Sequence, residues 1–265
     1  LVEVPRAAVE DAPAHTLELA DAAVLFGENA ALARASLAIG DELVVLAGPM
    51  GSGKSVCAAA LAGALPLDDG AALLDGKRLK AGDAGFAMQL PGDQFVAQTV
   101  REDIAAGACN RNAKKDAQPA AVEHAADYLG ISNLLGTPTS ELSAGQARLV
   151  AIAGTEVLHP AALVLDEPSA NLDSENLARV KALVKLMRDQ HIPVVVAAND
   201  LAPWVDLASR IIFMRNGKVA YVCDGAAART RTQPYVSCGA EPPFVVSVRA
   251  LAGMGTRRRG GNGEA

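Results

Sequence analysis

A glycine-rich segment at residues 48–55 carries the clearest chemistry in this sequence. It reads G-P-M-G-S-G-K-S and fits the phosphate-loop pattern G-x-x-x-x-G-K-[ST] in full. Its glycines let backbone N–H groups point inward onto an anion, Lys54 can reach the β- and γ-phosphates, and the Ser55 hydroxyl can bind Mg²⁺. We therefore expect a bound nucleoside triphosphate with magnesium. The candidate phosphate-binding residues are Gly48, Pro49, Met50, Gly51, Ser52, Gly53, Lys54 and Ser55.

Two adjacent carboxylates, Asp166 and Glu167, follow an apolar run that reads as a buried strand. Open α/β sheets bind ligands at this end of their strands, and neighbouring acids repel each other unless a cation lies between them. We expect Asp166 to hold Mg²⁺ through water, and Glu167 to act on the attacking water as a general base or as the group that orients it. The alternative, a surface turn after a core strand, is weakened by the nearby phosphate loop.

A third segment, L-S-A-G-Q at residues 142–146, begins a predicted helix with Ser143 as its N-cap. Small residues at a helix start form an anion-binding site. One chain rarely needs two triphosphate sites of this kind, so we expect a second chain to use this one. The candidate nucleotide contacts in the segment are Ser143, Ala144, Gly145 and Gln146.

Apolar strands alternating with helices must position these segments, and this pattern predicts a parallel sheet in an α/β fold. Residues 16–39 alternate in polarity between turns, which predicts an antiparallel β region. Phe26, the only aromatic residue in that region, is equally compatible with stacking on adenine and with a place in the core. Strands are predicted at 43–47, 161–165, 193–198 and 211–214, and helices at 56–65, 141–158 and 176–190.

The chain has 265 residues, 51% of them apolar, and a formal net charge of −6. This length suits one large α/β domain, and the acidic balance argues against a nucleic-acid partner. The 4 cysteines lack metal-type spacing, so we expect free thiols in a reducing compartment. We expect neither a membrane span nor a signal peptide, because the apolar runs are short and no basic segment precedes one near the start.

The order of the three motifs resembles that of the nucleotide-binding subunits of ABC transporters, over roughly residues 17–225. The resemblance implies a P-loop ABC-type ATPase domain with a parallel core sheet, an N-terminal antiparallel β subdomain and a helical subdomain at about 90–158. We accordingly expect a flexible leader at 1–15, the ATPase domain at 16–228, and a partly disordered C-terminal extension at 229–265. No helical period is evident beyond about Gly225, and we assign the extension no role.

The resemblance also implies roles for individual residues. The 142–146 segment would close on ATP held by the other chain of a dimer. Gln89 would be the Q-loop glutamine that contacts the γ-phosphate and magnesium. Asp173 would end the D-loop at the dimer interface, and Phe26 would stack on adenine.

Asn199 departs from the family pattern, which places a histidine in contact with the γ-phosphate at this position. Asparagine can hydrogen-bond a phosphate oxygen, but it is shorter and cannot carry a proton. We expect an ATPase whose catalytic candidates are Glu167, Gln89 and Asn199, and whose own ATP site turns over slowly.

Residues 88–94 (M-Q-L-P-G-D-Q) and 99–103 (T-V-R-E-D) are similar to segments in the ATPases of energy-coupling-factor importers and of the related cobalt and nickel importers. This resemblance implies a subunit that hydrolyses ATP to import a vitamin or a transition-metal ion. It would pair with a second ABC ATPase, the same or a different chain, on a transmembrane coupling subunit at the cytoplasmic face of the membrane. The alternatives are a soluble non-transport ABC ATPase and a phosphotransferase, which would have no use for the 142–146 segment.

Overall fold

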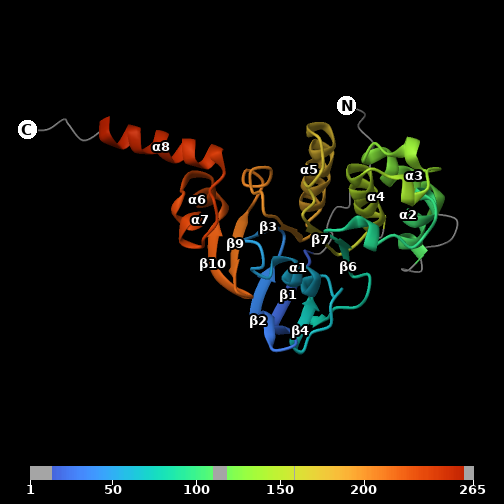
Figure 1. The fold of residues 1–265 in the computed structure, drawn as a ribbon, viewed down its shortest axis with the longest axis horizontal. Coiled ribbons are helices and arrows are strands. Elements are labelled where there is room, and N and C mark those ends of the chain that lie inside the picture. The colour runs from blue at the N-terminus through green and yellow to red at the C-terminus, as the bar shows by residue number, and fades with distance from the viewer. Residues whose placement is uncertain (1–13, 110–117, 158, 260–265) are drawn as a thin grey trace, which may run out of the picture.

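The computed structural model describes residues 14–109, 118–157 and 159–259 (Figure 1). Within them lie a central parallel sheet, a smaller antiparallel sheet, a group of helices at one end and a short C-terminal helical segment at the other. Most of the expected leader at 1–15 lies outside the described residues. The predicted α/β class with a parallel core sheet is confirmed.

The central sheet has six strands in the order β10-β9-β3-β8-β7-β6. Its inner strands are short, β-branched and buried on both faces, as expected for parallel strands covered by helices. Only β10 runs antiparallel, as the second arm of the hairpin with β9. The strands are β3 (Leu43–Ala47), β6 (Ala84–Ala87), β7 (Ala162–Asp166), β8 (Val194–Ala197), β9 (Arg210–Arg215) and β10 (Lys218–Asp224).

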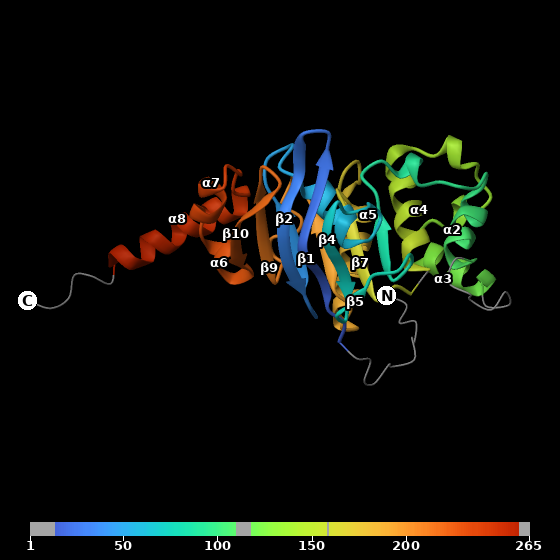
Figure 2. The same cartoon turned by 90° about the horizontal axis from the view of Figure 1, so that it is seen from below.

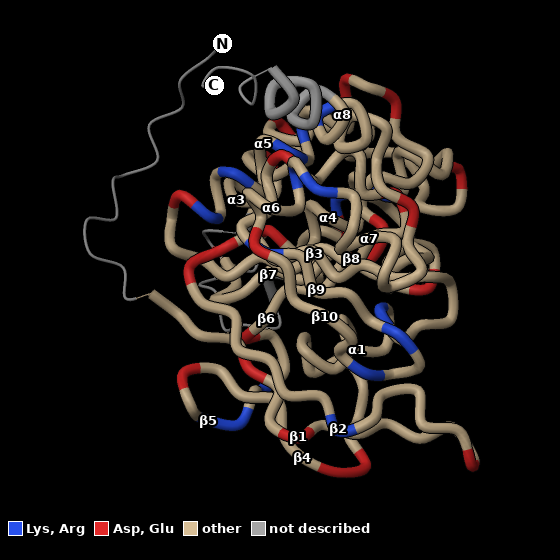
Figure 3. The backbone as a smooth tube through the Cα atoms, turned by 90° about the vertical axis from the view of Figure 1, so that its left-hand side faces the viewer, with Lys and Arg blue, Asp and Glu red and all other residues tan. Residues whose placement is uncertain are grey.

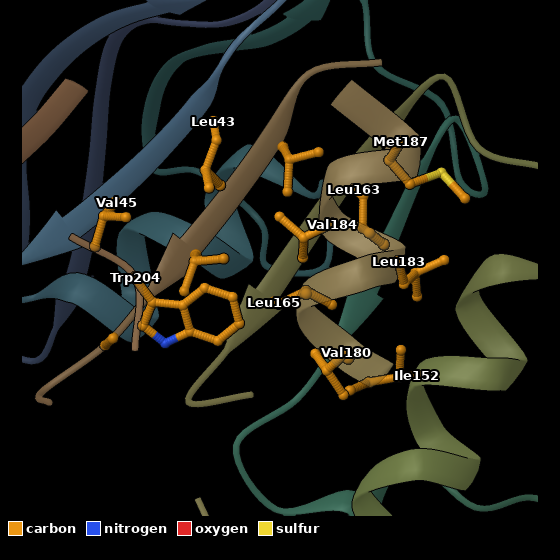
Figure 4. Close-up of a cluster of buried hydrophobic side chains, with 14 of the residues drawn as sticks. Leu43, Val45, Ile152, Leu163, Leu165, Val180, Leu183, Val184, Met187 and Trp204 are labelled. Carbon is orange, nitrogen blue, oxygen red and sulfur yellow. The ribbon is translucent and has the colours of Figure 1, made fainter. Parts of the chain in front are cut away.

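Alternate residues of each central strand pack into two different hydrophobic clusters. In β3, Val44 and Leu46 join the cluster beneath α1 (Lys54–Leu61), whereas Leu43 and Val45 join the cluster that includes α5 (Ser174–Asp189). Figure 4 shows the second cluster, in which the α5 residues face the β7 side chains beside the fully buried Trp204. Both faces of the sheet are therefore packed against helices, and this close packing keeps the strand ends in fixed positions.

The predicted antiparallel β region is confirmed as a four-stranded sheet in the order β2-β1-β4-β5, seen at the centre of Figure 2. It places Phe26, the last residue of β1, beside the phosphate loop. Strand β1 is irregular: Asp21 adopts a φ of 51°, and the pairing with β2 shifts register at this point. The strands are β1 (Leu17–Phe26), β2 (Asn29–Ile39), β4 (Asp69–Leu74) and β5 (Lys77–Arg78).

The helical group contains α2 (Val100–Cys109), α3 (Gln118–Tyr128) and α4 (Ala144–Glu156), which pack on one another. A capping box starts α2: the Glu102 N–H donates to Thr99 Oγ1 at 3.3 Å, and the Thr99 N–H donates to Glu102 Oε2 at 3.2 Å. Single-turn 3₁₀ helices lie at Pro91–Asp93, Ser132–Leu134 and Thr139–Glu141. The α2–α4 group occupies the end of the molecule opposite α8 (Figure 1).

The C-terminal segment folds into α6 (Gly225–Thr230), α7 (Gln233–Ser237) and α8 (Phe244–Arg259), although the sequence shows no helical period there. Its anchor is Tyr235, which is fully buried, stacks edge-on against Phe213 of β9 and donates a 2.7 Å hydrogen bond to the Ala228 carbonyl. These helices are held by a few contacts of this kind and not by a continuous apolar stripe. The spacing of apolar residues therefore does not predict them. On the face seen in Figure 3, basic and acidic residues are interspersed.

Candidate nucleotide site

The phosphate loop joins β3 to α1 in a backbone conformation that only glycine adopts easily. Gly48, Gly51 and Gly53 have φ values of 142°, 75° and 98°. A Cβ added to Gly53 would lie 2.6 Å from the Ala31 carbonyl oxygen, so β2 closes over the loop. Lys54 folds back over the loop and donates to the carbonyls of Gly48 at 2.9 Å and Pro49 at 3.0 Å. The ammonium group is thereby held over the cradle that the loop forms.

A pocket of about 500 Å³ opens above this loop. Segments far apart in the sequence meet at it: the end of β1, the phosphate loop, the Q-loop after β6 and the loop after β8. Its aromatic wall is Phe26, which is 57% exposed and therefore does not belong to the core. The lining residues are Phe26, Ala31, Met50, Gly51, Ser52, Gly53, Lys54, Ser55, Val56, Gln89 and Asn199.

Asp166 and Glu167 lie at the carboxyl end of β7 and are buried, with 4% and 8% exposure. Burial raises the pKa of Asp166, and a hydrogen bond from Ser55 and the charges of Lys54 and Arg148 oppose that rise. Burial likewise raises the pKa of Glu167, with Asp166 adding to the rise. Two buried acids beside a lysine and a hydroxyl form an oxygen-rich site that favours a cation.

Glu167 is held through its backbone and its side chain. Its φ of 51° is left-handed, a conformation that costs a non-glycine residue about 1 kcal/mol or more. The Glu167 N–H donates to the Ala197 carbonyl at 2.8 Å, and the Asn199 N–H donates to Glu167 Oε1 at 2.8 Å. The end of β8 therefore fixes where this carboxylate points.

None of the residues of the 142–146 segment lines the pocket of its own chain. The predicted N-cap is present as a capping box: the Gln146 N–H donates to Ser143 Oγ, and the Ser143 N–H donates to Gln146 Oε1. Ser143 and Ala144 are exposed, and a Cβ on Gly145 would lie 2.7 Å from the Asn171 carbonyl oxygen. Asn171 shortly precedes the start of α5, where Asp173 accepts from the Asn176 N–H.

Sequence reasoning missed Arg148, which is 3% exposed within α4 and donates hydrogen bonds to carbonyls of both the Gln89 segment and β7. The available signal was a lone arginine within the apolar run A-R-L-V-A-I-A that follows Gln146. Such a residue is buried only if its charge is satisfied.

A strand–phosphate loop–helix unit beside a buried aspartate–glutamate pair defines a P-loop nucleoside triphosphatase. A family profile described as "ABC transporter" matches residues 34–170. The chain belongs to this family, and as a member it is an ATP-binding ATPase. Among the described residues, no helix has both the length and the apolar character needed to cross a membrane.

Two relatives are named as ATP-binding proteins of transport systems. The chain is 35% identical over 226 residues to the cobalt import ATP-binding protein CbiO of Rhodobacter capsulatus, covering 80% of each chain. It is 30% identical over 216 residues to the energy-coupling factor transporter ATP-binding protein EcfA1 of Streptococcus agalactiae, covering 79% of this chain and 77% of the relative.

Solved structures of ABC transporter proteins share the fold of this chain. CbiO1 of Clostridium perfringens, part of an ABC transporter complex, is 27% identical and superimposes with a TM-score of 0.66 over 79% of this chain and 88% of that one. A dimeric ATP-binding cassette bound to ADP and phosphate is 22% identical and superimposes with a TM-score of 0.71 over 78% of this chain and 98% of that one. The second likeness concerns the fold alone.

Proposed function

We propose that this chain hydrolyses ATP to drive an importer of the energy-coupling-factor or cobalt type. It would pair with a second ABC ATPase, of the same or a different sequence, and bind a transmembrane coupling subunit as a peripheral protein at the cytoplasmic face of the membrane. The names of its relatives favour this function over a soluble, non-transport ABC ATPase. The cargo would be a transition-metal ion such as cobalt, or a vitamin.

One observation supports the proposal: the exposed helix start at Ser143 is not among the residues that line the pocket. The phosphate loop, Phe26 and Gln89 line it, whereas the capped helix start at Ser143 is exposed outside it. A helix N-terminus with free N–H groups favours an anion. In a dimer, Ser143 of one chain would contact the triphosphate on the phosphate loop of the other, and the Asp173 segment would lie at the seam between them.

The residues present suit magnesium. Ser55, Asp166 and Gln89 offer oxygen atoms, the donors that Mg²⁺ prefers, and the Ser55 hydroxyl already bonds the Asp166 carboxylate. When bound, the ion would neutralise charge on the phosphates. The amides at 48–55 and Lys54 would bind the phosphates, Phe26 would stack on adenine, and Glu167 would orient the attacking water or accept its proton.

The residue at position 199 affects the rate of ATP hydrolysis that we expect. Asn199 lines the pocket, and its side-chain amide can donate to a phosphate oxygen but cannot carry the proton that a histidine could. We therefore propose that hydrolysis at this site depends on Glu167 and Gln89 and is slow.

ATP-dependent dimerisation tests the two-chain site. Glu167→Gln should bind ATP with magnesium and sediment as a dimer, because the site closes but does not hydrolyse. Adding Ser143→Arg should leave ATP binding intact and abolish the dimer, whereas Lys54→Ala should lose binding itself. Dimers that persist with Ser143→Arg would contradict the proposal.

The membrane partner is tested separately, by expressing the chain with and without its neighbouring genes and separating the membranes. Membrane association that requires those genes supports the importer, and a chain that stays in the soluble fraction under both conditions favours the alternative. Uptake of labelled cobalt or of a labelled vitamin by the same cells would then identify the cargo.

A further inference from the structure

Arg148 bridges two strand ends at the point where their backbone pairing stops. The parallel strands β6 and β7 pair as far as Ala87 and Leu165. The next carbonyls along each strand, those of Met88 and Asp166, both accept from Nη1 of Arg148, at 3.1 and 3.2 Å. One guanidinium nitrogen thus links the two strands at the position where backbone hydrogen bonding between them has ended.

The second guanidinium nitrogen reaches one residue further along the Q-loop. Nη2 of Arg148 donates to the carbonyl of Gln89 at 2.8 Å, the shortest of the three bonds. A planar guanidinium fixes several acceptors at once, which a lysine ammonium on its flexible stem does not. The backbone of Gln89 is therefore held at a set place relative to Asp166 and Glu167.

The same side chain ties this junction to the helical group. Arg148 belongs to α4, the helix whose exposed start is Ser143. A buried guanidinium that loses its hydrogen-bond partners is left as an uncompensated charge, which is strongly unfavourable. Consequently, α4 cannot move away from Gln89 and β7 at low cost, and a displacement of the Ser143 end is transmitted to Gln89.

We propose that Arg148 is a positioning residue for ATP hydrolysis, which holds Gln89 against the end of β7 and couples it to the helix that begins at Ser143. The inference rests on the proposed function, because it assigns Arg148 to the site in which Gln89 and Glu167 act. Arg148 itself lies outside the residues that line the nucleotide pocket.

Three variants of the full chain test this role. Arg148→Met removes the hydrogen-bond donors at similar side-chain volume. Arg148→Lys keeps the positive charge but not the planar set of guanidinium donors. Arg179→Met is the matched control. Arg179 also donates to two backbone carbonyls, those of Leu129 and Gly130, each at 3.4 Å. Neither of these residues lines the nucleotide pocket or belongs to the Gln89 segment.

The first readout is hydrogen exchange, which needs no turnover. Arg148→Met should speed amide exchange at least about tenfold in residues 88–94, with or without ATP, and the Arg179→Met control should leave that segment unchanged. Full ATP-binding stoichiometry would show that the variant is folded. Unchanged exchange at 88–94 in Arg148→Met, or equal loosening throughout the chain, would overturn the proposal.

The second readout is the split between kcat and KM. Arg148→Met should lower kcat about tenfold with KM for ATP within about twofold, and Arg148→Lys should remain impaired. In a Gln89→Ala background, Arg148→Met should lower kcat by less than about twofold further, since both changes disable the same element. Additive effects, or full kcat in Arg148→Lys, would refute the positioning role.

Failure of the wider proposal gives a different result. If Glu167→Gln hydrolyses ATP as fast as the parent chain, the catalytic assignment itself is wrong. If Glu167→Gln is inactive while the Arg148 and Gln89 changes act independently, only the role of Arg148 fails.

Discussion

The backbone N–H of Asn199 donates a 2.8 Å hydrogen bond to Oε1 of Glu167. The bond comes from the main chain, so it survives any change of the Asn199 side chain except to proline. Asn199 also lines the nucleotide pocket. The loop after β8 therefore controls two things separately: its backbone fixes the position of the Glu167 carboxylate, and its Asn199 side chain determines which group can face the phosphates.

Asn199→His should raise kcat for ATP hydrolysis by about tenfold, since a histidine adds a group able to carry a proton at the γ-phosphate. The measurement is steady-state ATPase activity with the partner subunits present. Asn199→Ala is the control: it keeps the backbone bond to Glu167, loses the side-chain amide, and should be slower than the parent. No gain with histidine would show that the side chain at 199 does not limit turnover.

Gly53→Ala should abolish ATP binding, because φ is 98° there and the new Cβ would lie 2.6 Å from the Ala31 carbonyl oxygen. The matched control is Gly40→Ala, a turn position where the added Cβ meets nothing within 4 Å. Titration calorimetry with ATP should detect no binding by the first variant and parent-like binding by the second. Parent-like affinity in Gly53→Ala would mean that the loop tolerates displacement from β2.

Cys57 makes stability depend on pH in the alkaline range. The thiol is fully buried on α1, and burial raises its pKa from 9.0 to about 12. A raised folded-state pKa contributes stability that is complete below pH 9 and is lost as pH rises toward 12. The difference amounts to at most about 4 kcal/mol.

Denaturant unfolding at about pH 8, 9 and 10 measures this effect. The free energy of unfolding should fall above about pH 9 in the parent chain and fall less steeply in Cys57→Ala, whatever the variant loses in absolute stability. If the free energy of unfolding falls equally with pH in the two proteins, the folded chain accommodates the Cys57 thiolate as readily as the unfolded chain does.

Tyr235→Phe should destabilise the chain by about 1–2 kcal/mol, because it removes a buried hydroxyl and leaves the Ala228 carbonyl without that donor. The loss should appear as a lower denaturation midpoint with unchanged ATP affinity, since neither Tyr235 nor Phe213, on which it packs, lines the nucleotide pocket. Reduced ATP affinity in this variant would indicate coupling between the C-terminal helices and the nucleotide pocket.

Most of the nucleotide site can be predicted from local spacing. The phosphate loop, the acids after β7 and the helix N-cap at Ser143 are short segments whose chemistry depends on neighbours in sequence, so the pattern predicts them directly. The parallel sheet follows from strands that are apolar on both faces, and the predicted boundaries of α4 and β7 agree with the observed ones within two or three residues.

Long-range contacts are beyond the reach of such patterns. Whether Phe26 faces adenine or the core depends on where β1 ends relative to the phosphate loop, and the packing of the two sheets leaves it exposed at the pocket. The C-terminal helices depend on Tyr235 meeting Phe213, a contact that leaves no period in the chain.

Motif spacing thus specifies which groups are available to bind phosphate and metal, since a motif sets the types and order of its donors. How those groups are held is a property of the folded chain: Asn199 lies against Glu167, and Arg148 lies across Gln89 and Asp166. Arg148 and Gln89 are separated by 59 positions, and their hydrogen bond forms only once α4 packs beside the end of β6. Such a bond has no local signature, because neither residue's neighbours in sequence indicate what it will meet in space.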